Sequence, residues 1–165
     1  MSEIRLQREL KVPPIEAFLA LGEILSEIAA QRGAWRGFAL HVGLGELHLS
    51  DVGYVAIPVS LTVGKPRSDA HAIDVSFRAV KHPESFPTFT GSVGIEATGP
   101  TGANLWLGGG YDVPLQLFGR FFDATIASGV ARRTLENLID DLAQAVVANV
   151  DKREYEYVRY QLYER

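Results

Sequence analysis

The chain has 165 residues, a formal charge of −4 at pH 7 and no cysteine. A domain of this length buries roughly 70% of the surface that its unfolded chain exposes, so it can form a core without covalent staples. The lack of cysteine excludes disulfides, thiolate metal sites and cysteine nucleophiles. The acidic balance disfavours nucleic acid as a partner, because binding to phosphates depends on basic side chains.

The N-terminal segment MSEIRLQRELKV alternates charged and apolar residues and lacks the continuous apolar core of a signal peptide. Later apolar stretches are interrupted by charged residues or glycine before they reach the roughly 18 residues that a membrane-spanning helix needs. We therefore expect a cytoplasmic protein without a membrane span. Neither an internal repeat nor a linker-like composition divides the chain, so residues 1–165 are expected to form a single domain.

The first predicted elements are a strand and a helix. Apolar residues alternate with polar ones from Ile4 to Val12, which is the period of two of a half-buried strand, and Arg8 alone interrupts the apolar row. Pro13 and Pro14 end the strand. The helix predicted from about Pro14 to Gln31 has one apolar face and should therefore lie across another apolar surface.

The middle of the chain, from Gly37 to Asp112, returns to a period of two and is punctuated by Gly, Pro, Asp and Ser. This pattern predicts five or six antiparallel strands joined by short turns. The apolar parity changes at Gly45, which indicates a bulge or a break between two strands. Pro58 cannot donate a ladder hydrogen bond and so indicates an edge or a bulged position. With the first strand included, we expect a sheet of six or seven strands.

The last third of the chain is predicted to form one long helix from about Leu115 to Val150, because its apolar residues recur at helical spacing. The tail from 151 to 165 is rich in charge and tyrosine and should either continue this helix or fray. A sheet whose apolar face is covered by one long helix is an α+β arrangement. We therefore predict a curved antiparallel sheet wrapped around the C-terminal helix.

Three segments carry a family resemblance: FPTFTG at Phe86–Gly91, GGYDVPLQLFGRFFD at Gly109–Asp123, and the helical ARRTLENLIDDLAQAV. They resemble a bacterial branch of the START-like superfamily, also called SRPBCC or Bet v 1-like, and the resemblance extends from Ile4 to about Val150. It implies the helix-grip fold and a cavity between sheet and C-terminal helix, typically occupied by lipids, sterols, polyketides or other hydrophobic molecules. No single activity is implied, because the superfamily holds carriers, enzymes and partner-binding proteins.

Several large apolar residues have the parity or position to converge in such a fold. On the residues alone, an ordinary core is the favoured interpretation, whereas the resemblance makes a ligand pocket equally favoured. The candidate pocket residues are Phe77, Phe89, Leu107, Tyr111, Phe118 and Phe122.

Arg8 is the sharpest anomaly, because a charge within a buried apolar row is costly unless it is paired or hydrated. It could reach solvent at a sheet edge, where inward charges are common. Alternatively it lies in the cavity and binds a ligand carboxylate or carbonyl. We favour the sheet edge, and we retain Arg8 among the candidate ligand-binding residues.

His41, Glu46, His48 and Asp51 lie close together in the sequence and include metal-type ligands. Strand alternation would place His41 on the face opposite Glu46 and His48, so a shared site would need the bulge inferred at Gly45. Surface or rim residues are the simpler interpretation. We predict no metal, no cofactor and no catalytic residue.

We therefore expect a protein that binds or carries a hydrophobic small molecule such as a lipid, a fatty acid or a polyketide-like compound. One alternative is an enzyme of the polyketide cyclase or dehydratase kind. Another is an interaction module whose cavity is filled by its own side chains. Of the ionisable residues, only Arg8, Tyr111 and His48 are candidates to point inward. That set is thin for acid–base catalysis, so we favour a carrier over an enzyme.

Overall fold

The computed structural model describes residues 2–30, 39–43, 54–81, 88–112 and 124–163. Strands and helices follow one another as the periodicity predicts. In chain order the elements are β1 (Ser2–Leu10), α1 (Pro14–Ala30), β2 (Ala39–Gly43), β3 (Tyr54–Arg67), β4 (Ala72–Ala79), β5 (Thr88–Gly99), β6 (Gly102–Asp112) and α2 (Ala124–Tyr163).

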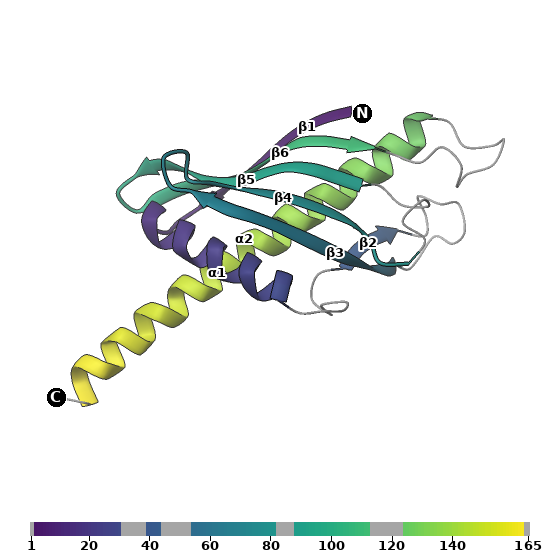
Figure 1. Cartoon of the computed structure of the whole chain (residues 1–165). Helices are drawn as coiled ribbons and strands as arrows, with labels where there is room; N and C mark the ends of the chain where they lie inside the picture. The colour runs from purple at the N-terminus through teal and green to yellow at the C-terminus, as the bar shows by residue number, and fades with distance from the viewer. Residues whose placement is uncertain (1, 31–38, 44–53, 82–87, 113–123, 164–165) are drawn as a thin grey trace.

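All described strand pairs are antiparallel, and the strand order is β1-β6-β5-β4-β3-β2. Strands β1, β6, β5, β4 and β3 form one continuous sheet. The short β2 pairs with the first residues of β3 and so extends the sheet to six strands. The sheet curves over α2, and α1 lies beside α2 near one end of the sheet (Figure 1). The α+β helix-grip architecture expected from the sequence is confirmed, with five strands in the main sheet and the short β2 as a sixth.

Local sequence explains where the first elements begin and end. Pro14 opens α1, and the backbone N–H of Ala17 donates to the carbonyl oxygen of Pro13 at 2.9 Å to close the first turn. In β3 the register shifts between Val63 and Pro66, so the irregularity predicted at Pro58 lies nearer the other end of the strand. Pro58 itself pairs with Ala39 at the end of β2, and beyond it β3 is an edge strand of the sheet.

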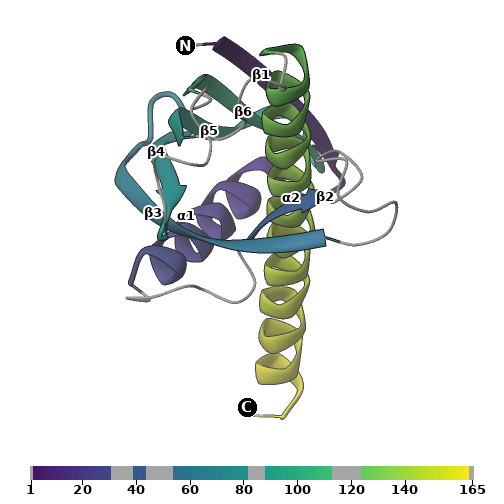
Figure 2. The same ribbon diagram turned by 90° about the vertical axis from the view of Figure 1, so that its right-hand side faces the viewer.

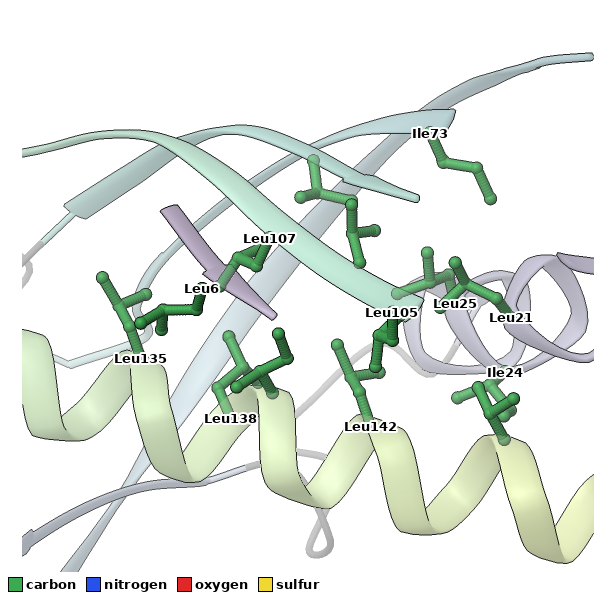
Figure 3. Close-up of a cluster of buried hydrophobic side chains, with 14 of the residues drawn as sticks. Leu6, Leu21, Ile24, Leu25, Ile73, Leu105, Leu107, Leu135, Leu138 and Leu142 are labelled. Atoms are coloured by element: carbon green, nitrogen blue, oxygen red, sulfur yellow. The ribbon is translucent and has the colours of Figure 1, made fainter. Parts of the chain in front are cut away.

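The core forms where α2 lies against the inner face of the sheet. Leu135, Leu138 and Leu142 of α2 point toward leucines of β1 and β6 (Figure 3). Leu21 and Leu25 of α1 continue the same cluster at the other end (Figure 3). The leucines of β1 and β6 that pack against α2 are Leu6, Leu105 and Leu107.

The C-terminal tail continues the helix, because α2 runs to Tyr163. The predicted helix start at Leu115 lies outside the described residues, and a single domain over residues 1–165 stays a prediction. Within the described ranges, neither helix has an apolar stretch long enough to cross a membrane.

Candidate functional site

An aromatic row crosses the inner face of the sheet. Phe77 of β4 pairs in register with Phe89 of β5, and Phe89 pairs with Tyr111 of β6. The rings of Phe77 and Phe89 stack with their centroids 5.0 Å apart and their planes at 19°. All three side chains are buried. The strand register therefore brings together three of the predicted pocket residues, although they are far apart in the sequence.

A pair of glycines lies next to this row and accommodates the Phe89 ring. Gly91 pairs with Gly109, two residues further along each strand. A Cβ atom on Gly91 would lie 2.7 Å from Cζ of Phe89 and 2.2 Å from the carbonyl oxygen of Gly108. A Cβ atom on Gly109 would lie 3.0 Å from the same Cζ and 2.4 Å from the carbonyl oxygen of Thr90. The Phe89 ring thus packs directly against the backbone of Gly91 and Gly109, so these two glycines have a packing role.

Leu107 lies on the same face but belongs to a different environment. It pairs with Val93 on one side and with Leu6 on the other, beyond the glycine pair. It is only 1% exposed and points toward α2 (Figure 3). The structure therefore places Leu107 in the packed core beneath α2. Phe118 and Phe122, the other predicted pocket residues, lie outside the described residues.

Arg8 faces α2, as the parity of β1 predicts, and its guanidinium meets a carboxylate of that helix. Arg8 Nε donates to Oδ1 of Asp140 at 2.5 Å, and Nη2 donates to Oδ2 at 3.4 Å. Nη1 donates to the backbone carbonyl oxygen of Gln7 at 2.9 Å. The hydrogen bond to Asp140 raises the pKa of Arg8 above its ordinary value.

This pairing resolves the anomaly of a charge in an apolar row. β1 is an edge strand of the sheet, and the side chains of Arg8 and Asp140 are 34% and 47% exposed. The guanidinium is therefore both partly hydrated and paired, which removes most of the cost of its position. The described hydrogen-bond partners of Arg8 are Asp140 and the backbone of Gln7, both in the protein itself. A role for Arg8 in ligand binding stays a prediction.

One buried polar group on α2 was not predicted. Among the buried side-chain oxygen and nitrogen atoms of the described residues, Thr134 Oγ1 and Oδ1 of the half-buried Asn149 have no hydrogen-bond partner. Thr134 is 3% exposed and is the only polar residue in the buried set of the described chain. Helical threonines commonly donate to the carbonyl four residues before, and a buried hydroxyl without a partner is unusual. The spacing of Ala131, Thr134 and Leu138 at three and four could have indicated its inward position.

Among the surface depressions lined by described residues, one lies over the sheet and another lies beside α1. The first, of about 220 Å³, lies over β3, β4 and β5, and its lining includes Phe77 and Phe89 of the aromatic row together with the exposed Ser60, Thr62, Arg78 and Thr90. The other, of about 530 Å³, lies between α1 and the β3–β4 turn and includes Phe18, Leu19 and Ile73. The cavity predicted behind the aromatic row stays a prediction.

Comparison with known proteins places the fold. No family model and no curated protein matches the chain. A conserved protein from Geobacillus kaustophilus superposes with a TM-score of 0.55 at 16% identity, covering 92% of this chain and 96% of that one. Norcoclaurine synthase from Thalictrum flavum, in complex with dopamine and hydroxybenzaldehyde, gives a TM-score of 0.52 at 12% identity and covers 89% and 87%.

A third solved structure is the di-domain ARO/CYC protein BexL from the BE-7585A biosynthetic pathway, with a TM-score of 0.53 at 15% identity. The match covers 92% of this chain and 47% of BexL, so the chain spans about half the length of that protein. This chain has the START-like, helix-grip fold. At these identities the likeness establishes the fold alone, and it confirms the fold that the sequence resemblance implied.

Within this START-like fold, the metal-type residues that the sequence singled out remain untested. The side chains of His41, Glu46, His48 and Asp51 lie outside the described part of the structure. Among the side chains that are described, no group of three or more His, Asp or Glu residues could hold a metal ion. His71, by contrast, is described: it is exposed, and its ring meets the ring of Phe18 edge-on at 5.3 Å.

Proposed function

We propose that this START-like protein binds or carries a hydrophobic small molecule between the inner face of the sheet and α2. The observation that carries the proposal is the buried row of Phe77, Phe89 and Tyr111 across three neighbouring strands. Ligand pockets are lined mainly by apolar and aromatic side chains with a few polar groups that fix orientation. Tyr111 fits this description, because it combines an aromatic ring with a hydroxyl that can donate or accept a hydrogen bond.

Thr134 supplies a second reason to expect a ligand. A buried hydroxyl without a partner costs free energy, and a ligand carbonyl or hydroxyl would recover it by completing the hydrogen bond. The proposed ligand therefore has an apolar body and at least one hydrogen-bonding group. Fatty acids, other lipids and polyketide-like aromatic compounds meet this requirement. Norcoclaurine synthase, which has the same fold, has been crystallised with two small aromatic molecules.

A carrier fits the described residues better than an enzyme of the cyclase or dehydratase kind. General acid–base catalysis needs an ionisable group within hydrogen-bond reach of the substrate. Of the described residues on the inner row of β1, only Arg8 is ionisable, and its guanidinium is held by Asp140. Arginine also keeps its proton in proteins, so Arg8 is a poor general base. Tyr111 is the remaining predicted candidate whose position is described.

Native mass spectrometry and lipid extraction of the gently purified protein test the proposal with no ligand chosen in advance. We expect a bound mass in the apolar extract, and a rise in melting temperature when the stripped protein is titrated with a fatty acid or an aromatic compound. The absence of both a bound mass and a rise in melting temperature with any hydrophobic probe would contradict the proposal. That result would support the interaction module, whose cavity is filled by its own side chains.

A further inference from the structure

The last part of α2, residues 151–163, projects beyond both the sheet and α1 (Figures 1 and 2). We call this part the projecting tail. Eight large hydrophobic residues are exposed among the described residues, and five of them lie in the projecting tail. These five are Tyr155, Tyr157, Val158, Tyr160 and Leu162. The tail continues the 40-residue α2, and its exposed apolar residues indicate a surface that packs against a partner.

The root of the projecting tail is fixed to the body of the protein. Arg153 lies between two carboxylates of α1: its Nη1 is 3.8 Å from Oε2 of Glu16, and its Nη2 contacts Oε1 of Glu23. Two contacts on one guanidinium set the direction in which the helix leaves the domain. A surface held in one orientation loses less conformational entropy when it docks than a loose segment does.

The apolar residues of the projecting tail follow the spacing of a helix–helix seam. Tyr155, Val158 and Leu162 are separated by three and four residues, which corresponds to positions a, d and a of a heptad. They are 69%, 47% and 70% exposed, so this side of the helix is free in the described structure. Tyr157 and Tyr160 lie on another side of the helix. The seam is therefore available to an external helix.

Charge decides which partner fits the seam. Residues 151–163 carry three acidic and three basic side chains, so the tail has no net charge. Amphipathic helices that bind anionic membranes instead have a basic polar face. Glu154 directly precedes the seam residue Tyr155, and Arg159 directly follows Val158. These are the flanking g and e positions that form ion pairs between the two helices of a parallel coiled coil.

We propose that two copies of the chain associate through the projecting tail, with the two helices parallel. The seam consists of Tyr155, Val158 and Leu162 from each copy, and Glu154 of each copy pairs with Arg159 of the other. An antiparallel arrangement would set Arg159 against Lys152 of the other copy and is disfavoured by like charge. Because the seam covers fewer than two heptads, the dimer is weak and depends on protein concentration.

Sedimentation velocity of the full chain over a wide concentration range tests the proposal. We expect a reversible monomer–dimer equilibrium in the wild type. Val158→Asp should remain monomeric at every concentration, while its melting temperature at the lowest concentration matches that of the wild type, since Val158 is exposed. A wild type that is monomeric throughout, or a Val158→Asp variant that dimerises as the wild type does, would overturn the proposal.

Charge reversal tests the parallel pairing itself. Glu154→Arg and Arg159→Glu should each weaken self-association by about tenfold or more, because each places like charges across the seam twice. An equimolar mixture of the two variants should associate more tightly than either alone, since each mixed dimer regains two opposite-charge pairs. Glu96→Arg, which makes the same charge change on β5, should leave association unchanged. A mixture that associates no better than its components would overturn the parallel arrangement.

Discussion

Arg8 of β1 and Asp140 of α2 form a two-point ion pair across 132 residues of sequence, and it ties the edge strand of the sheet to the helix. Because both side chains are a third or more exposed, solvent screens the pair. We expect Arg8→Met to lower the free energy of unfolding by about 0.5–1 kcal/mol. A double-mutant cycle with Asp140→Asn, measured by urea denaturation, should show coupling of the same size.

The same variant tests whether Arg8 also meets a ligand. With its guanidinium held by Asp140, Arg8→Met should change the affinities for a fatty acid and for its uncharged ester equally. A selective loss of about 1.5–3 kcal/mol for the acid would instead place the guanidinium against the ligand's carboxylate. Parallel titrations of both proteins with both ligands separate these outcomes.

The close packing of Phe89 on Gly91 and Gly109 predicts that both glycines are required. Alanine at either position would push its Cβ against neighbouring backbone and the Phe89 ring, so we expect a loss of about 1–3 kcal/mol or more in the free energy of unfolding. Gly129 of α2 is the matched control, because a Cβ there would meet nothing within 4 Å. Gly129→Ala should be neutral or stabilising by up to about 1 kcal/mol. Equal effects at Gly91 and Gly129 would contradict this account of the packing.

Thr134→Val separates stability from binding. The substitution replaces a buried hydroxyl that has no partner with a methyl group of similar size, so the free energy of unfolding of the ligand-free protein should stay the same or rise by about 1–2 kcal/mol. The affinity for a ligand with a carbonyl or hydroxyl group should fall. Thr62→Val, on the exposed side of β3, should leave affinity unchanged. A destabilised Thr134→Val protein with unchanged affinity would show that the hydroxyl serves the fold.

The contact between Glu23 and Arg153 makes a small part of the stability depend on pH. The hydrogen bond from Arg153 lowers the pKa of Glu23 below its ordinary value. Its stabilisation is therefore fully present above the pKa of the unfolded state, about 4.3, and is lost as the pH falls through the lower pKa of the folded state. Glu23→Gln should be less stable than the wild type at pH 7 and should approach it in acid. A difference that is constant with pH would exclude this linkage.

Sequence periodicity predicts where the strands and helices lie, and the alternation in β1, β4, β5 and β6 indicates which side chains face the core. It could not supply the strand register, and the contacts of the site depend on that register. Phe77, Phe89 and Tyr111 were each predicted to face inward, but only the pairing of β4, β5 and β6 places them in one row. The partner of Arg8 lies on a distant helix, so no local pattern could identify Asp140.

An NMR titration of the protein with a fatty acid or an aromatic ligand locates the binding site residue by residue. Resonances of Phe77, Phe89, Tyr111 and Thr134 should shift with a common dissociation constant, while those of the exposed Thr62 and Arg78 on the outer face of the sheet should not shift. Shifts confined to the outer face, or to the depression between α1 and the β3–β4 turn, would contradict binding between the sheet and α2.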